Sequence, residues 1–224
     1  MATPYSLHVY DEVTSTQDIA ADALADEAVL VVAGRQTAGR GRSQRIWESA
    51  PRAMAASLAF RPVWAIGSWP LIPLVAGLAA ADVLGGEVGL KWPNDLLIDG
   101  EKIGGILVEG SAGVLVVGCG LNLWWPGAPP GSRARWIDDP GPGSVLNTAT
   151  AWADRFLERM SASAENWGRS EYLARSATIG RRVTWEPNGA GRVLDVGADG
   201  SLLVETDQGL KNLIAGEIRH LRTV

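Results

Sequence analysis

The residues best suited to chemistry lie in segment 36–47, QTAGRGRSQRIW, which contains Arg40, Arg42 and Arg45. Two glycines among them loosen the backbone, so main-chain N–H groups can turn toward a ligand and form an anion-binding concavity. Guanidinium groups add planar forks that match phosphate or carboxylate oxygens. Because the segment itself gives the arginines no acidic partner, it predicts an anionic ligand. A solvated basic turn is the alternative.

A lysine in an apolar context is the second candidate. Lys91 stands in LKWPND, at the end of an apolar strand, and a buried ammonium without an anion is costly. It is therefore either a cation aimed at negative charge that develops on a phosphoryl or acyl oxygen, or a snorkelling side chain paired with Asp95. Asn94 and Asp95 could orient the lysine, bind a hydroxyl group or a magnesium ion, or simply form a turn.

Two further features interrupt apolar strands. Gly104 and Gly105 stand in KIGGILVEG, where a glycine pair indicates either close approach of a ligand or a β-bulge. Asn122 stands in GCGLNLWW, and a buried amide needs partners, which a heterocycle edge or a main-chain carbonyl would provide. The phosphate-binding patterns GxxxxGK[ST] and GxGxxG are absent from the sequence, so a nucleotide would need another geometry.

Composition excludes several classes of protein. The 224 residues carry a net charge of −5, which argues against a protein that coats nucleic acid. Cys119 is the single cysteine and His8 and His220 lie at opposite ends, so neither a disulfide nor a zinc cluster is expected. The N-terminus does not resemble a signal peptide, and no run of about eighteen uninterrupted apolar residues indicates a membrane span. We expect a cytoplasmic protein.

The elements that must position these residues are predicted as an N-terminal unit and a smaller C-terminal one. After Thr16 we expect a helix of about three turns, and segment 68–84 reads as a buried helix between proline and glycine signals. Predicted strands cover 29–33, 53–60, 88–98, 103–109 and 114–123, with a hairpin turn at 99–100. A loop is expected over 125–144 and mainly helix over 145–177.

The composition changes after residue 180. Four short strands, 181–186, 191–197, 201–207 and 210–214, alternate with turn signals, a pattern typical of a small β-barrel. We therefore expect two domains, residues 1–177 and 178–224.

Five motifs together identify a family resemblance. STQ at 15–17, the arginine segment, KWPND at 91–95, KIGGILVE at 102–109 and GCGLNL at 118–123 occur in the order seen in biotin protein ligases (biotin–[acetyl-CoA-carboxylase] ligases). The resemblance implies the short form, without an N-terminal DNA-binding domain. It also implies an α+β fold: a mixed central sheet flanked by helices, similar to class II aminoacyl-tRNA synthetases and the biotin–lipoate ligase catalytic domain, followed by an SH3-like barrel.

The resemblance implies an ATP-dependent reaction in two steps. Biotin, as a substrate, is activated by ATP and Mg²⁺ to biotinoyl-5′-AMP, and a lysine of a biotin carboxyl carrier protein domain then receives the biotin. The Mg²⁺ would be held mainly by the ATP phosphates. No DNA and no membrane partner is implied, and the oligomeric state stays open. A lipoate or octanoate ligase, or a non-enzymatic biotin or nucleotide sensor, is the alternative.

The resemblance also assigns residues by motif. It implies Lys91 and Arg42 as catalytic, and it places biotin against Ser15, Thr16, Gln17, Gln36, Gly39, Arg40, Lys91, Gly104 and Gly105. ATP or the adenylate would contact Arg40, Arg42, Arg45, Trp47, Asn94 and Asn122. The sequence departs from the family at Gln44 and in the Pro/Gly-rich loop 125–144, so contacts there are not carried over.

Overall fold

The fold, described for residues 4–215 and 221–223 by a computed structural model, is built on one large mixed sheet. Within those residues seven strands follow the order β1-β2-β3-β7-β6-β5-β4. β1 and β2 run parallel and every other neighbouring pair is antiparallel, so the expected mixed sheet is confirmed. The strands are β1 (Tyr5–Val13), β2 (Ala28–Gln36), β3 (Arg52–Phe60), β4 (Gly89–Lys91), β5 (Asp95–Ile98), β6 (Glu101–Ser111) and β7 (Val114–Trp124).

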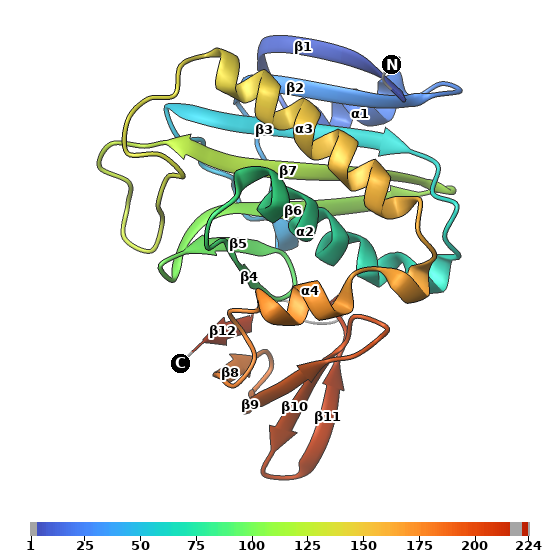
Figure 1. Ribbon diagram of the computed structural model, residues 1–224, viewed down its shortest axis with the longest axis vertical. Coiled ribbons are helices and arrows are strands. Elements are labelled where there is room, and N and C mark those ends of the chain that lie inside the picture. Colours follow the sequence, from blue (N-terminus) through green and yellow to red (C-terminus); the bar gives the residue numbers. More distant parts are fainter. Residues whose placement is uncertain (1–3, 216–220, 224) are drawn as a thin grey trace.

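Helices cover both faces of this sheet. α2 (Ile72–Leu84) and α3 (Gly143–Met160) cross one face side by side (Figure 1). α1 (Thr16–Ala23) packs on the other face, against β2, β3 and β7. The remaining helical segments are α4 (Arg169–Ala174) and the 3₁₀ turns η1 (Arg42–Gln44), η2 (Ile66–Leu71) and η3 (Ala164–Asn166).

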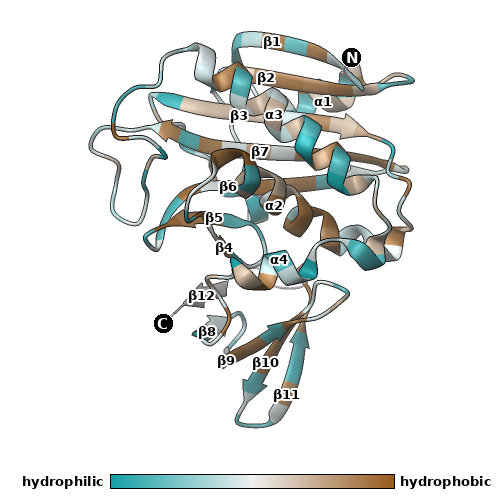
Figure 2. Cartoon of the chain, in the orientation of Figure 1, coloured by the Kyte–Doolittle hydropathy of each residue, from teal (hydrophilic) through white to brown (hydrophobic). Residues whose placement is uncertain are grey.

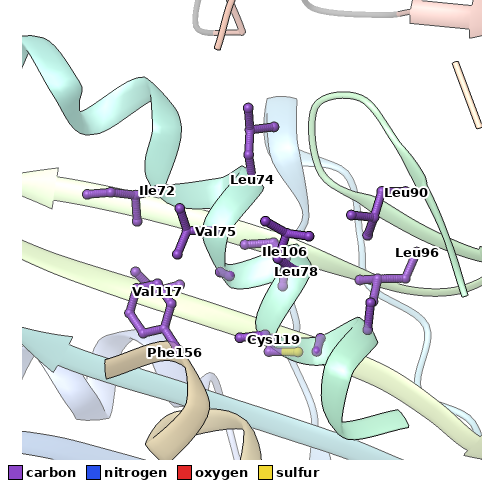
Figure 3. Close-up of a cluster of buried hydrophobic side chains, with 14 of the residues drawn as sticks. Ile72, Leu74, Val75, Leu78, Leu90, Leu96, Ile106, Val117, Cys119 and Phe156 are labelled. Atoms are coloured by element: carbon purple, nitrogen blue, oxygen red, sulfur yellow. The ribbon is translucent and has the colours of Figure 1, made fainter. Parts of the chain in front are cut away.

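The core lies between the sheet and α2. This helix is apolar on nearly every side (Figure 2) because it is buried by the sheet beneath it and by α3 beside it. Figure 3 shows Leu78 beside Ile106 of β6, with Val117 and Cys119 of β7 and Phe156 of α3 close by. Strand alternation sends every second residue of β3, β6 and β7 into this layer, and the residues between them face the side of the sheet that α1 covers in part.

One helical segment is apolar enough to cross a membrane by length and composition alone. Ile66–Leu84 spans 19 residues with a mean hydropathy of 1.5. The structure buries most of it in the core just described, and its first part is the 3₁₀ turn η2, which contains Pro70. It therefore reads as the central core helix of the fold, not as a membrane span.

The second sheet follows α4. It contains β8 (Arg182–Trp185), β9 (Gly189–Val196), β10 (Leu202–Thr206), β11 (Gly209–Leu213) and β12 (Leu221–Thr223), in the order β11-β10-β9-β8-β12 over the described residues. The expected four short strands are confirmed and β12 is added. β11 and β12 are the two edges and do not pair, so the described strands form an open sheet, and the predicted closed barrel is not confirmed.

The two sheets share a core. Trp92 is 1% exposed, and its indole Nε1 donates to the carbonyl of Gly200 at 3.0 Å. The Trp92 main-chain N–H donates to Thr178 Oγ1 at 2.9 Å, and Trp167 Nε1 donates to Ala198 O at 3.0 Å. One continuous hydrophobic cluster includes side chains from both sheets.

Two expectations about elements were wrong, and one element was not predicted. The N-terminal strand β1 was missed, because it is an edge strand with mostly exposed residues and no clear alternation. Segment 88–98 is not one strand, since Trp92 and Pro93 break it into β4 and β5. The first helix is shorter than expected and ends at Ala23.

A charged network ties α2 to α3 and α4. Asp82 of α2 accepts hydrogen bonds from Arg155, Arg159 and Arg175, and Arg159 also contacts Glu171. Burial opposes ionisation of Asp82, but the hydrogen bonds and charges of the arginines outweigh it, and the pKa of the carboxyl is lowered. Removing this carboxylate would leave several guanidinium groups without their shared anion.

We expect Asp82→Asn to destabilise the fold by about 3 kcal/mol, because breaking a partly buried ion pair strands the remaining charges. Glu158→Gln is the control, since the Glu158 side chain is 67% exposed, and it should cost less than about 1 kcal/mol. The folded pKa of Asp82 lies below its ordinary value of 3.8, so its stabilisation is complete above that pH and is lost as pH falls through the folded pKa. Urea unfolding at neutral and acidic pH measures both effects; equal stability of wild type and Asp82→Asn at pH 7 would contradict the account.

Candidate active site

A cavity opens on the face of the sheet that carries α1. Its floor consists of the residues of β3, β6 and β7 that alternate with the core positions, among them Ala55, Ser57, Gly105, Gly118 and Gly120. These five are small, which leaves room on this face of the sheet, and Leu107 of β6 is a larger lining residue beside them. A Cβ on Gly118 would lie 2.8 Å from Gln17 Oε1, and one on Gly120 would lie 2.9 Å from the Trp47 indole. Both positions therefore favour glycine.

One wall comes from the N-terminus of α1. The main-chain N–H and the hydroxyl of Thr16 both donate to Gln36 Oε1, at 2.8 and 3.1 Å, and the same hydroxyl lies 2.7 Å from Ser57 Oγ. Ser15 Oγ and Gln17 Oε1 are buried and have no hydrogen-bond partner among the described residues. Since buried polar atoms normally find partners, these two oxygens are available to a ligand.

A second wall comes from the arginine loop, residues 39–47. Contrary to the sequence expectation, Arg40 has acidic partners: it holds Asp18 through two hydrogen bonds, at 2.7 and 2.6 Å, and Glu109 at 3.2 Å. The hydrogen bond to Asp18 raises the pKa of Arg40 and lowers that of Asp18. Both acids lie far away in the chain, so segment 36–47 gave no sign of them.

The other two arginines differ in their surroundings. Arg42 donates to Asn94 Oδ1 at 3.3 Å and to the carbonyl of Ala215 beside the second sheet, and its burial lowers the pKa of the guanidinium. Arg45 is exposed, and its Nε donates to the carbonyl of Arg42 at 3.4 Å. The loop is therefore joined to both sheets through Arg42, while Arg45 extends at the mouth of the cavity.

The lysine that lines the cavity is Lys102, not Lys91. Lys102 Nζ donates to Asp95 Oδ1 and lies 5.7 Å from the centroid of the Trp47 ring. Lys91, the predicted catalytic lysine, ends β4 and is not among the residues that line the cavity. The predicted turn at 99–100 contained a signal for this: folding the hairpin there pairs Lys102 with Leu97 and Asp95 with Gly105, and the Lys102 ammonium reaches Asp95 diagonally across the two strands.

The structure brings most of the predicted site together. Ten predicted residues line this one cavity: Ser15, Thr16, Gln17, Gln36, Arg40, Arg42, Arg45, Trp47, Asn94 and Gly105. Gly39, Lys91, Gly104 and Asn122 do not line it. A Cβ on Gly104 would meet Leu121 at 2.5 Å, and Asn122 Nδ2 donates to Arg133 O at 3.3 Å. Lys102, Ser57, Gly118 and Gly120 are lining residues that the sequence interpretation did not single out.

The arrangement suits stabilisation of negative charge. Lysine and arginine side chains line a pocket whose floor consists largely of small, apolar residues. In such surroundings preorganised cations stabilise negative charge more strongly than they do in water. Cys119 is buried in the sheet, and burial raises the pKa of its thiol, so it stays protonated and is a poor nucleophile. In residues 4–215 and 221–223 no group of three or more His, Cys, Asp or Glu side chains could hold a metal ion.

Comparisons with known proteins agree with this geometry. The model of the "Biotin/lipoate A/B protein ligase family" matches residues 11–122. The chain is 34% identical to a biotin–[acetyl-CoA-carboxylase] ligase of Mycobacterium tuberculosis, over 95% of this chain and 89% of the relative. It is 30% identical to the bifunctional ligase/repressor BirA of Bacillus subtilis, over 93% and 72%.

A solved structure extends the similarity to the whole fold. The biotin protein ligase of Aquifex aeolicus in complex with biotin and ATP superposes with a TM-score of 0.84 at 26% identity, covering 98% of this chain and 99% of that one. The similarity includes the second sheet as well as the cavity.

Proposed function

The chain belongs to the biotin/lipoate A/B protein ligase family, and we propose that it is an ATP-dependent biotin protein ligase. The observation that carries the proposal is the cavity itself. Lys102 and three arginines line it together with small residues of the sheet, and two of its lining residues, Ser15 and Gln17, carry buried oxygens without a partner among the described residues. Such a cavity can hold an acid that has a polar ring at one end, an apolar chain in the middle and a carboxylate at the other end.

The first step forms an acyl-adenylate. A carboxylate oxygen of biotin attacks the α-phosphorus of ATP, the bond to the bridging oxygen of the β-phosphate breaks, and pyrophosphate leaves. Because negative charge concentrates on the phosphoryl oxygens and no covalent enzyme intermediate is needed, catalysis depends on position and on fixed positive charge. Lys102 and Arg42 supply this charge, and Arg45 reaches the phosphates from the mouth of the cavity.

The second step transfers biotin to the acceptor. The uncharged amine of a lysine on a biotin carboxyl carrier protein domain attacks the acyl carbon, AMP leaves with the bonding electron pair, and an amide forms as the amine loses a proton. The mixed anhydride is sensitive to water. Trp47, whose indole packs directly on Gly120, would border the space for the adenylate and shield it from water.

The polar wall suits the ring of biotin. Ser15 Oγ and Gln17 Oε1 are acceptors that could receive ring N–H groups, and Thr16 and Gln36 are fixed by their mutual hydrogen bonds. Asn94 adjoins Arg42 and belongs to the adenylate end. Gly39, Gly104 and Asn122 do not line the cavity. Any effect of these three residues on a ligand would be indirect, through the lining residues beside them.

The site suits Mg²⁺ that binds together with ATP, as the complex of the two. The described residues offer it no cage of three or more metal-binding side chains, and Mg²⁺ commonly binds through substrate phosphates and water. When bound, it neutralises charge on the triphosphate. The chain's own residues would contribute their cations from the other side of the phosphates.

The second sheet we propose to be an SH3-like module. The supporting observation is that β8 to β11 pair in sequence order while β12 returns to pair with β8. The contact between Arg42 and Ala215 would let this module influence how the arginine loop closes. The boundary near residue 178 and a cytoplasmic location stay predictions.

A substrate comparison tests the proposed function. Purified protein with ATP and Mg²⁺ should release pyrophosphate when biotin is added, and release with lipoate or octanoate should be at least about a hundredfold slower, since those acids leave the polar wall unpaired. Release with octanoate or lipoate but not biotin would assign the chain to the other branch of the family. Binding of biotin without any release would make it a sensor.

A further inference from the structure

The side-chain amide of Gln17 is held in one orientation. Its Nε2 donates to Glu109 Oε2 at 2.9 Å and to the carbonyl of Val116 at 3.4 Å. Its Oε1 is buried, has no partner among the described residues, and lies 2.8 Å from the place where a Cβ on Gly118 would stand. Gln17 is 5% exposed and lines the cavity, so this oxygen belongs to the polar wall that a ligand would contact.

The opposite orientation is unfavourable for an electrostatic reason. A rotated amide would place Oε1 against the Glu109 carboxylate and the Val116 carbonyl, which are both acceptors. It would also direct the NH₂ group into the cavity. Because an ionised carboxylate can only accept, Glu109 keeps the NH₂ group turned toward itself and the oxygen turned toward the ligand.

Glu109 is itself held in place from outside the cavity. The oxygen that receives the Gln17 NH₂ group also receives a hydrogen bond from Arg40, at 3.2 Å, and Arg40 is anchored by Asp18. The Glu109 side chain is 45% exposed and is not among the residues that line the cavity. Its effect on a ligand is therefore indirect and passes through Gln17.

We propose that Glu109 is a positioning residue that fixes Gln17 as a hydrogen-bond acceptor and so selects ligands with an N–H donor at the polar wall. The inference rests on the proposed function, because the ring of biotin carries two N–H groups, whereas lipoate and octanoate carry none. A ligand without the donor leaves Gln17 Oε1 buried and unpaired. The selection against it is set before any chemistry takes place.

The test compares ligands that differ from biotin only in one ring N–H group. Two cyclic carbamates, in each of which one ring N–H of biotin is replaced by oxygen, are compared with biotin by calorimetric titration of the full chain. Wild type should bind at least one isomer about a hundredfold more weakly than biotin, since a buried acceptor loses its donor and meets another acceptor. In Glu109→Gln the new amide can donate a hydrogen bond to Gln17, which lets the Gln17 amide rotate. The ratio of the carbamate dissociation constant to that of biotin should then fall below about tenfold.

Two further variants separate this effect from general loosening. Asp18→Asn weakens the anchor of Arg40 without touching the Gln17 amide, so it should keep the wild-type ratio. Gln17→Ala should abolish the discrimination, and adding Glu109→Gln to it should change the ratio no further, as expected when one residue acts only through the other.

An unchanged ratio in Glu109→Gln, with biotin still bound, overturns the inference and leaves the proposed function intact. An equal fall of the affinity ratio in Asp18→Asn also overturns the inference, because the effect would then come from Arg40. Absence of biotin binding by wild type would overturn the proposed function, and this inference with it.

Discussion

Replacing Lys102 by alanine is expected to slow adenylate formation by about a thousandfold, the upper range for removal of one preorganised charge from a reacting oxygen. Lys102 lines the cavity, and its ammonium lies between Asp95 and the face of Trp47. In the proposed reaction the charge on the phosphoryl and carboxylate oxygens grows toward the transition state. The loss should therefore fall on the rate, while the dissociation constant for biotin should change by less than about tenfold.

Lys91→Ala is the matched control for this prediction. Both residues are lysines of the same sheet, on strands separated by β5, but Lys91 stands outside the cavity, so its removal should change the rate by less than about twofold. Rapid-quench measurement of pyrophosphate in a single turnover, with biotin affinity measured separately, checks both variants. A large loss in Lys91→Ala with a small loss in Lys102→Ala would restore the assignment made from the sequence.

The second large effect is expected on folding. Trp92→Ala should lower the free energy of unfolding by about 4 kcal/mol, because it leaves a cavity of indole size in the core. Trp92 is 1% exposed and joins β4 to Gly200 and Thr178 of the C-terminal region. Since one hydrophobic cluster includes both sheets, unfolding by urea should be a single transition followed equally by fluorescence and far-UV circular dichroism.

Trp92→Phe is the conservative control. It keeps most of the buried ring but loses the hydrogen bond to Gly200, so it should cost about half as much as alanine or less. Two separate transitions in the wild type, or a Trp92→Ala variant as stable as wild type, would show that the sheets are independent units and that Trp92 does not join them.

The sequence predicted the parts of the fold that depend on local pattern. The strand at 53–60 is a continuous apolar run and the hairpin has turn residues at 99–100, and both are confirmed. β1 escaped prediction because an exposed edge strand need not alternate. The break at Trp92 and Pro93 was hidden because both flanking pieces are apolar.

The sequence predicted the candidate site only where the contacts of a residue are with residues close to it in the chain. Arg40 is partnered by Asp18 and Glu109, which lie 22 and 69 positions away, and no local pattern shows such a pairing. The choice between Lys91 and Lys102 needed the strand register, because each is a single lysine in an apolar strand. The small residues of β3, β6 and β7 become informative only when the alternation shows that they share one face.

In the proposed function this cavity both makes biotinoyl-5′-AMP and holds it until transfer. The most direct measurement is mass spectrometry of the small molecules that remain with the protein after incubation with biotin, ATP and Mg²⁺ and removal of free ligand. Wild type should retain biotinoyl-5′-AMP, and Lys102→Ala given the same time should retain biotin with little adenylate. Wild type that retains only unreacted biotin, or an octanoyl or lipoyl adenylate in preference when all three acids are supplied, would contradict the account.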